Sequence, residues 1–600
     1  MEDRKVNRNT RQNSAARKDR FKKRRQSFNP KTAETDSLSF STSAKKIKYL
    51  EDMHVPTDNT VEYRILNFFT VFSVISNVVK CKICNGDVQF QTCSDRGLGF
   101  KITVMCNTCP PNYISSCPFI GHTYEINRRF IYVMRILGLG LEGCKKFCGL
   151  MDLPPFLNQT TYDIMVKNMK ECVNTVAEKI FSNAVEEEKK ETCKKYNLDY
   201  TNELTISGDG TWQKRGFNSL FGVASLIGYY SSKIIDVCVK SIYCKMCEVW
   251  SKKMNVKENE YKEWYETHKE NCSANHTSSS GKMEVDAVIE MFNRSEEKYG
   301  VKYRYYIGDG DSKTFTGILQ KVDYGNDFEI FKKECVGHVQ KRMGARLRNI
   351  VNNTVVEVET KNKKRIKRKV LGGKGKLTGK TIDKLTVYYG LAIRRNCENI
   401  EDMKKGIWAT FYHYASTNEN PQHDMCPVGE DSWCEWQRAA AMDKLQSFVH
   451  SYDNFSNDIL QAIRPVYEDL SSDTLLKRCI GGFDQNNNES YNQLIWKITP
   501  KIVPSGSTIV DIAAKISACV FNEGSSSHLA ILYSMGVKLG RNSVDYCRKL
   551  DEKRINAAEY RAKLATREAR ILQRQKNSEQ LDILEGVEDL FYGPGIDDSV

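Results

Sequence analysis

Hydrophobic patterning is clearest in the middle of the chain, where it predicts three consecutive strands. A β-branched stretch over 204–212 contains Gly-Asp-Gly around Asp209. Two apolar runs follow at about 219–229 and 233–242, with a turn at Tyr-Ser-Ser-Lys between them. Short apolar or alternating runs bounded by turn residues are typical of strands. The first strand is therefore expected to end in a carboxylate with little bulk around it.

A helix and a fourth strand are predicted next. Residues 283–300 have apolar positions every three or four residues, the spacing of one helix face. The aromatic run 302–307 is typical of a strand, and it leads into a second Gly-Asp-Gly around Asp309. This order of elements resembles the RNase H-like fold, in which the ends of the first and fourth strands are neighbours. The resemblance implies that Asp209 and Asp309 converge, and two adjacent carboxylates suit a hard divalent cation.

The first third of the chain is predicted to hold a hairpin and then helices. Alternating stretches at 87–92 and 99–105 are joined by an Asp-Arg-Gly turn. From 125 to about 195 the apolar spacing becomes helical, and Pro154-Pro155 separates the helices. This segment is either a helical support or a small DNA-binding module.

Composition and charge narrow the class of protein. The chain has 600 residues, 40% of them apolar, which is enough for several domains with real cores. Its net charge of +15 favours a polyanionic partner, most simply nucleic acid. The polar N-terminus predicts no signal peptide, and no apolar run suits a membrane span. The 21 cysteines are therefore expected in an intracellular protein, where paired cysteines more often hold metal than each other.

The first 25 residues carry eleven Lys and Arg, ending in the cluster RKDRFKKRR. Residues 1–48 are low in apolar content, so we expect a disordered arm. The cluster fits a nuclear-import signal or a DNA-contacting arm, and a solvated basic tail without function is the alternative.

Two CxxC pairs predict a structural zinc site near the start of the ordered chain. Their 21-residue separation and intervening hairpin match two zinc knuckles. The four predicted ligands are Cys81, Cys84, Cys106 and Cys109.

A second cysteine group follows the third strand. Cys244 and Cys247 form a CxxC pair, and Cys272 and His276 come later in NCSANH. Zinc bound by these four residues would organise an insertion that has little core of its own, with His268 as a rival ligand.

A third carboxylate is needed for a two-metal phosphoryl-transfer site. Downstream, FDQNNNESYNQLIW places Glu489 at the start of a helical pattern, with Asn486, Asn487 and Asn488 as candidate caps.

Together these motifs resemble the Mutator-like transposases. The resemblance covers about residues 65–545. It rests on the sequence motifs GDGTWQKRGF, SGKMEVDAV, YIGDGDSKTF, ECVGHVQKRMG and N-x-x-E-x-x-N. The resemblance implies an Asp-Asp-Glu triad on an RNase H-like fold, a Cys-x-x-His motif after the second Asp, and a helical insertion before the Glu. By position, the triad is Asp209, Asp309 and Glu489, and the Cys-x-x-His motif is Cys335 and His338. Asp311 remains an alternative second carboxylate, although Asp309 directly follows the apolar run.

The expected insertion contains a strongly basic run. Residues 361–380 include ten Lys and Arg and no acid, so this is either a solvated loop or a loop that contacts DNA phosphate. The candidate contacts are Lys363, Lys364, Arg365, Lys367, Arg368 and Lys369. GKGKLTGKT has one residue too few for a P-loop, so nucleotide binding is not expected. His413, His423, Cys426 and Cys434 are irregularly spaced, and a third zinc site there stays open.

The predicted fold class is α/β, an RNase H-like core with zinc-binding and helical insertions, preceded by a zinc-ribbon-like and a helical segment. Its parts are an arm at 1–48, a ribbon at 61–124, helices at 125–200, the first core part at 201–345 with a zinc knuckle at 243–277, a mainly helical insertion at 346–475, the last core part at 476–545, and a basic helix with an acidic tail at 546–600.

The predicted function is DNA transposition in the nucleus. The triad would use two Mg²⁺ or Mn²⁺ ions, with zinc purely structural, on double-stranded DNA. The resemblance implies a homo-oligomer, and neither a membrane nor a nucleotide is an expected partner. Two rivals stay open: a transposase-derived regulatory DNA-binding protein without catalysis, and a nuclease of the same fold.

Overall fold

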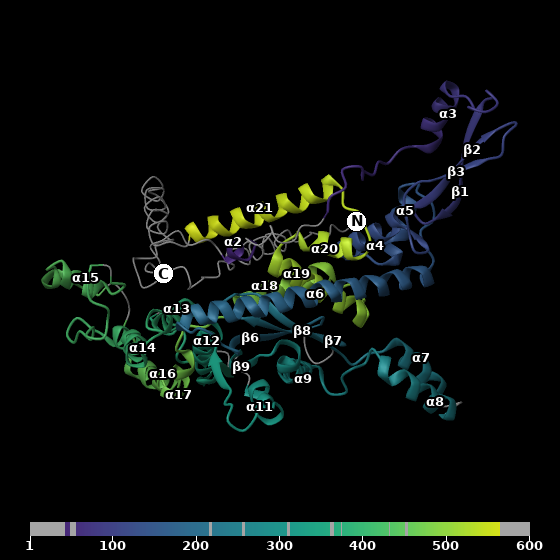
Figure 1. Cartoon of the computed structure of the whole chain (residues 1–600). Coiled ribbons are helices and arrows are strands. Elements are labelled where there is room, and N and C mark those ends of the chain that lie inside the picture. The colour runs from purple at the N-terminus through teal and green to yellow at the C-terminus, as the bar shows by residue number, and fades with distance from the viewer. Residues whose placement is uncertain are drawn as a thin grey trace, which may run out of the picture.

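A computed structural model describes residues 42–47, 56–214, 219–254, 258–308, 312–359, 365–373, 375–430, 432–450 and 454–564. The fold is mixed α/β (Figure 1). A central sheet is flanked by helices; a small β module and the helices α7 and α8 project at one end, and a group of helices that includes α14 to α17 lies at the other (Figure 1). Among the described residues, none of the helices combines the length and the apolar character that crossing a membrane requires.

The N-terminal module is built on the predicted hairpin. β1 (Val88–Arg96) and β2 (Gly99–Cys106) pair antiparallel, and β3 (Asn112–Ser115) adds a third strand. The apolar helix α3 (Phe68–Val78) packs on this hairpin, with its Phe72 ring against Phe90 of β1 and its Phe68 ring against Phe100 of β2. The short strands β4 (Phe119–Ile120) and β5 (Thr123–Tyr124) lead into the helical part.

Three helices follow, as the apolar spacing predicted. They are α4 (Glu125–Ile136), α5 (Leu141–Leu150) and the long α6 (Gln159–Tyr196). Pro154 and Pro155 lie between α5 and α6, and Asn158 caps α6 by accepting a hydrogen bond from the Thr161 amide. The first half of α6 packs with α4 and α5 in one apolar core, and its second half reaches the sheet.

The central sheet has five strands in the order β10-β9-β6-β7-β8. Its strands are β6 (Glu203–Trp212), β7 (Phe221–Gly228), β8 (Ile234–Ser241), β9 (Lys302–Gly308) and β10 (Phe331–Glu334). β6, β7 and β8 form an antiparallel meander, whereas β9 runs parallel to β6 and β10 runs parallel to β9. The predicted neighbourhood of the first and fourth strands is therefore confirmed, with Ser207 in register with Ile307.

Helices cover both faces of this sheet. On one face lie α9 (Ser280–Asn293), α10 (Ser295–Tyr299) and α11 (Ser312–Lys321). On the other lie α18 (Asn486–Ile498) and α19 (Ser507–Glu523), together with the middle of α6. Because both faces are covered, β7 is buried along its whole length.

Two insertions interrupt the sheet. The first, between β8 and α9, holds α7 (Lys245–Met254) and α8 (Glu258–His268), whose Trp250 and Trp264 rings stack 5.0 Å apart. The second follows β10 and is mainly helical. It contains α12 (Val336–Asn353), the hairpin of β11 (Val355–Glu359) and β12 (Arg365–Lys369), α13 (Gly379–Arg395), α14 (Ile400–Ala415), α15 (Glu435–Ala441), α16 (Asn457–Leu470) and α17 (Asp473–Cys479).

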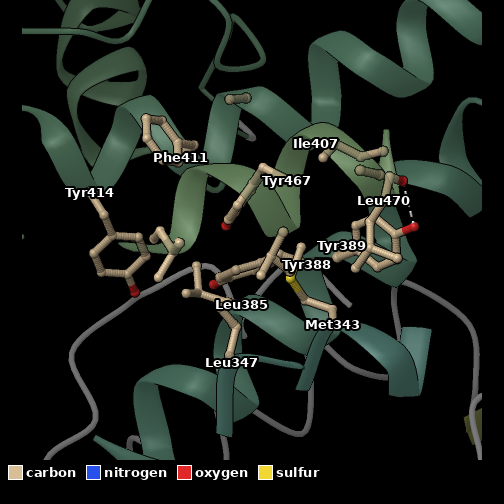
Figure 2. Packing of buried hydrophobic residues seen from close by; sticks show 14 of the residues in the cluster. Met343, Leu347, Leu385, Tyr388, Tyr389, Ile407, Phe411, Tyr414, Tyr467 and Leu470 are labelled. Carbon is tan, nitrogen blue, oxygen red and sulfur yellow. Dashed lines mark hydrogen bonds between the residues drawn. The ribbon is translucent and has the colours of Figure 1, made fainter. Parts of the chain in front are cut away.

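The second insertion has a hydrophobic core of its own. Figure 2 shows Met343, Leu347 and Leu385 packed with the rings of Tyr388 and Tyr467. The Tyr389 hydroxyl donates a hydrogen bond to the Leu470 carbonyl at 2.8 Å, so this buried polar atom is satisfied (Figure 2).

The C-terminal helices follow the sheet, and the first of them, α20 (Ser527–Ser534), packs on α6. Both α20 and α21 (Arg541–Leu564) follow α19. Within the arm predicted to be disordered, Thr42–Ile47 form the helix α2, which packs against α19 and α21. The prediction was wrong for these six residues because Ile47 is buried and Lys46 lies over the Phe521 ring. The rest of the arm, with its basic cluster, and the acidic tail lie outside the described residues.

Candidate active site and metal-binding groups

Strand β6 presents different side chains to the two faces of the sheet. Ser207, Asp209 and Thr211 all contact α18, as their hydrogen bonds show. Gly208 and Gly210 alternate with them and lie on the opposite face, Gly208 next to Tyr306 and Gly210 next to Glu284 of α9. The predicted carboxylate, Asp209, therefore lies on the α18 face and is partly exposed.

A ladder of side-chain hydrogen bonds fixes α18 on β6. The Asn488 amide oxygen accepts a hydrogen bond from the Ser207 hydroxyl at 2.8 Å. The Asn492 amide nitrogen donates to Asp209 Oδ2 at 2.8 Å. The Trp496 ring nitrogen donates to Thr211 Oγ1 at 2.8 Å. Before the helix, the Gln485 amide donates to the Gly208 carbonyl at 2.7 Å.

The ladder fits because the distance between bonded residues along the helix α18 nearly equals the distance between their partners along the strand β6. Residues four apart on a helix rise by about 6 Å, and residues two apart on a strand by about 6.7 Å. Asn488, Asn492 and Trp496 are spaced by four, and Ser207, Asp209 and Thr211 by two. Each rung therefore meets its partner without strain on either element.

The glycines on the opposite face make room for a buried tyrosine. A Cβ at Gly208 would lie 2.6 Å from Tyr306 Cε2, and a Cβ at Gly308 would lie 2.7 Å from Tyr306 Cε1. Tyr306 is 2% exposed, so its ring has little freedom to move aside. The first glycine of each Gly-Asp-Gly motif, Gly208 and Gly308, thus serves packing around one ring.

The second carboxylate cannot be placed, because Asp309 and Asp311 lie outside the described residues. Asp309 directly follows Gly308, the last residue of β9, the strand beside β6. The choice between Asp309 and Asp311 therefore stays open.

Glu489 lies on α18, next to the ladder residue Asn488. Its Oε1 is 3.9 Å from Lys341 Nζ on α12, and its side chain is 58% exposed. Glu489 thus faces α12 at an accessible position on the helix that bonds to Asp209. Convergence of Asp209, Asp309 and Glu489 on one site stays a prediction.

The three asparagines before Glu489 are not caps, contrary to the prediction. α18 begins at Asn486, so all three lie inside its first turn. The side chain of Asp484 accepts a hydrogen bond from the Asn486 amide at 3.1 Å instead. An aspartate just before the helix provides the acceptor, and this leaves Asn488 free to bond to β6.

The Cys-x-x-His motif lies between β9 and α18. The Cys335 amide donates to the Gly308 carbonyl at 3.4 Å, and the Val336 amide donates to the Phe483 carbonyl at 2.9 Å. Burial raises the pKa of the Cys335 thiol, which favours its neutral form. His338 lies in the first turn of α12, where its amide donates to the Cys335 carbonyl. The motif thus ties the end of β9 to the chain that enters α18.

The four cysteines of the first predicted zinc site lie together in the structure. The ligand atoms of Cys81, Cys84, Cys106 and Cys109 all lie within 4.8 Å of one another. Cys84 Sγ is 3.6 Å from Cys106 Sγ, and Cys81 Sγ is 3.9 Å from Cys109 Sγ. Backbone hydrogen bonds from Cys84 and Ile83 lower the pKa of the Cys81 thiol to about 6, which favours the metal-binding thiolate. This group can hold a zinc ion.

The second group contains His268 and not His276. Cys244 Sγ is 3.3 Å from His268 Nε2, and Cys247 Sγ is 3.4 Å from Cys272 Sγ. His268 ends α8 four residues before Cys272, which brings both ligands to one end of that helix. His276 instead lies 3.5 Å from an Asp286 oxygen and 3.1 Å from the Ser279 carbonyl. The spacing signal was present in H-x-x-x-C, but it requires α8 to be recognised.

The third group is also assembled, in the helical insertion. His413, His423, Cys426 and Cys434 are all buried, and their ligand atoms lie within 4.8 Å of one another. The sequence left this site open because its spacing is irregular.

Part of the basic run, Arg365–Lys369, forms one strand of a hairpin. Lys363 and Lys364 lie outside the described residues, and Arg365, Lys367, Arg368 and Lys369 lie on β12. β11 pairs with this strand so that Glu357 is opposite Lys367 and Glu359 is opposite Arg365.

Comparison with known families identifies the chain. The family model described as Mutator-like transposase matches residues 62–434, more than half of the 600 residues. The chain therefore belongs to the Mutator-like transposase family. The matched span contains β6 with Asp209 and the Cys-x-x-His motif, whereas α18 with Glu489 lies beyond it. No curated protein matches the chain.

Proposed function

We propose that this protein is a DNA transposase that cleaves and joins DNA strands through Asp209, Asp309 and Glu489. Family membership supports a transposase in general. The strand order β10-β9-β6-β7-β8 is the order expected of an RNase H-like core, the fold inferred here. The hydrogen bond from Asn492 to Asp209 carries the proposal, because it joins the strand of the first carboxylate to the helix of the third.

The surroundings of Asp209 fit a bound cation. Oδ1 accepts a hydrogen bond from the Gly210 amide and Oδ2 accepts one from Asn492, and both donors are uncharged. Among the described residues, the buried amide oxygens of Asn492 and Gln485 have no hydrogen-bond partner. Oxygen atoms of this kind next to a carboxylate suit a hard ion such as Mg²⁺ or Mn²⁺.

Each residue would have its own part in the site. Asp209, Asp309 and Glu489 would hold the divalent ions, which supply Lewis-acid activation of the attacking and leaving oxygens. Asn492 holds Asp209 Oδ2 in place, and Gln485 and Asn488 keep α18 in register with β6. Lys341 would keep the Glu489 side chain oriented between catalytic events.

Zinc would have only structural roles here. We infer that the group with Cys81 and the group with Cys244 each hold one zinc ion, since soft thiolate and imidazole donors at tetrahedral spacing suit it. Each would stabilise a module that projects from the main body.

DNA would contact the basic hairpin β11–β12 and the basic arm. Residues 361–380 carry ten Lys and Arg and no acid, so this run is the strongest candidate for phosphate contact. A homo-oligomer and a nuclear location complete the proposal, the latter because the RKDRFKKRR cluster fits an import signal.

The direct test uses purified full-length protein and DNA that carries the genomic sequences flanking its gene. We expect Mg²⁺-dependent nicking and strand transfer with the wild type. Asp209→Asn and Glu489→Gln should abolish both while leaving DNA affinity unchanged or slightly higher, because a negative charge is removed near phosphate. Gln493→Ala, on an exposed neighbour in α18, is the matched control and should cleave normally.

The outcomes separate the rival functions. Cleavage without joining would identify a nuclease of the same fold. Binding without cleavage in the wild type would identify a regulatory DNA-binding protein. Wild-type cleavage by Asp209→Asn would overturn the triad.

A further inference from the structure

The third Cys/His group is a closed, buried cage within the helical insertion. His413 lies on α14, His423 and Cys426 lie in the following loop, and Cys434 directly precedes α15. Their exposed fractions run from 0% for Cys434 to 4% for His413. Four side chains of metal-ligand type that are buried this deeply, with their ligand atoms within 4.8 Å of one another, form a preorganised donor set.

The spacing of the ligand atoms is that of a tetrahedral metal site. His423 Nδ1 is 3.4 Å from Cys434 Sγ and 3.8 Å from Cys426 Sγ. His413 Nδ1 is 4.0 Å from Cys426 Sγ. Zinc bonds of about 2.3 Å to sulfur and 2.0–2.1 Å to nitrogen place such atoms about 3.6 Å apart.

A chain of hydrogen bonds from Asn418 through His450 to His423 determines which ring nitrogen of His423 carries the proton. The other ring nitrogen, which lies beside the two sulfurs, then keeps its lone pair. The backbone N–H of His450 lies 3.0 Å from Asn418 Oδ1, and His450 Nδ1 lies 2.7 Å from the same atom. A backbone N–H can only donate, so this Asn418 atom is an oxygen that accepts both bonds. His450 Nδ1 therefore carries a proton, and its neutral ring offers Nε2 as an acceptor.

The relay continues from His450 to His423. His450 Nε2 lies 3.0 Å from His423 Nε2, and Ser416 Oγ lies 2.9 Å from His423 Nε2. His423 thus donates its Nε2–H to these two acceptors, and its Nδ1 keeps a lone pair directed at Cys426 and Cys434. Metal-binding histidines characteristically donate the other ring N–H to a partner that fixes the tautomer.

We propose that His413, His423, Cys426 and Cys434 bind one zinc ion and that the Asn418–His450 relay positions His423 for it. Two thiolates and two imidazoles in a closed tetrahedron suit a structural zinc, and the two thiolates neutralise its charge. The ion joins the loop after α14 and the start of α15 to α14. Most side chains of the loop at 417–430 are exposed, so the zinc would hold this loop where few apolar contacts do.

The three Cys/His groups can be told apart in one sample, because their donor sets are four sulfurs, three sulfurs with one nitrogen, and two of each. The probe is the full-length protein loaded with ¹¹³Cd in place of zinc, since the ¹¹³Cd resonance moves with the number of sulfur ligands. We expect three resonances, and three zinc ions per chain in the zinc-loaded protein. Two metals and no resonance from a two-sulfur site would overturn the proposal, and this wild-type measurement does not depend on any variant folding.

Two variants sharpen the test. Cys434→Ser should lose the two-sulfur resonance alone and lower the zinc content from three to two, whereas Cys106→Ser should lose the four-sulfur resonance alone. His450→Phe keeps a ring but removes one of the two acceptors of the His423 Nε2–H, the one that Asn418 holds in a fixed tautomer, so zinc in the third site should bind about 10- to 100-fold more weakly while the other two sites are unchanged. Retention of three zinc ions by Cys434→Ser would refute the ligand set, and unchanged affinity in His450→Phe would refute the relay.

Discussion

Asn492 is expected to act as a positioning residue for Asp209, and its replacement should slow cleavage without weakening DNA binding. Its amide donates to Asp209 Oδ2 at 2.8 Å. A hydrogen bond to a charged group contributes about 1.5–3 kcal/mol, so Asn492→Ala should lower the cleavage rate by roughly 10- to 150-fold. The loss arises because Asp209 can then rotate away from the geometry that holds a cation.

The identity of the replacement separates hydrogen bonding from packing. Asn492→Asp has the shape of the native side chain, but it places an acceptor where the donor was and brings two carboxylates together. If the hydrogen bond matters, Asn492→Asp should be at least as slow as Asn492→Ala. If Asn492 only fills space, the Asp variant should cleave like the wild type and the Ala variant should be slower.

The assay is Mg²⁺-dependent cleavage of the flanking DNA, with DNA affinity measured in parallel by fluorescence anisotropy. Gln493→Ala controls for changes in helix propensity, since it alters the adjacent, exposed position of α18. A wild-type rate for Asn492→Asp would refute the positioning role.

Two further predictions concern stability. Gly208→Ala should destabilise the fold by about 1–3 kcal/mol in denaturant unfolding, because its Cβ would lie 2.6 Å from the buried Tyr306 ring, whereas Gly149→Ala, with open space around it, should be neutral or stabilising. Burial lowers the pKa of His528 to about 4 from 6.5, so the folded state disfavours the proton that the unfolded chain binds below pH 6.5. Stability should therefore fall by up to about 3 kcal/mol as the pH drops from 6.5 to 4. Thermal unfolding of His528→Phe across this range should show a weaker pH dependence, and an equal dependence would contradict the assignment.

Local patterns in the sequence predicted much of the fold. The strands β6 to β9 follow from runs of apolar residues, and the ribbon site follows from two CxxC pairs that need only a hairpin between them. His268 was missed as the favoured ligand because its position depends on α8, a helix rich in Glu and aromatic residues with little apolar periodicity.

Long-range contacts account for what the sequence did not predict. The ladder between α18 and β6 joins residues that are 281 to 285 positions apart, so no local pattern predicts it, although the four-residue spacing of Asn488, Asn492 and Trp496 was a visible signal. The third Cys/His group is irregular in sequence because α14 and the following loop bring its ligands together through tertiary packing.

The separation of 283 residues between Asp209 and Asn492 also bears on how the protein is made. During translation, β6 emerges long before α18, and the insertion between them has its own hydrophobic core. Domains generally fold as units while the chain lengthens, so the insertion can form first and shorten the loop that α18 must close. A ribosome that stops before α18 releases a chain with a sheet and a basic hairpin but without Glu489. We expect such truncated products to occupy DNA without cutting it and so to compete with the complete enzyme.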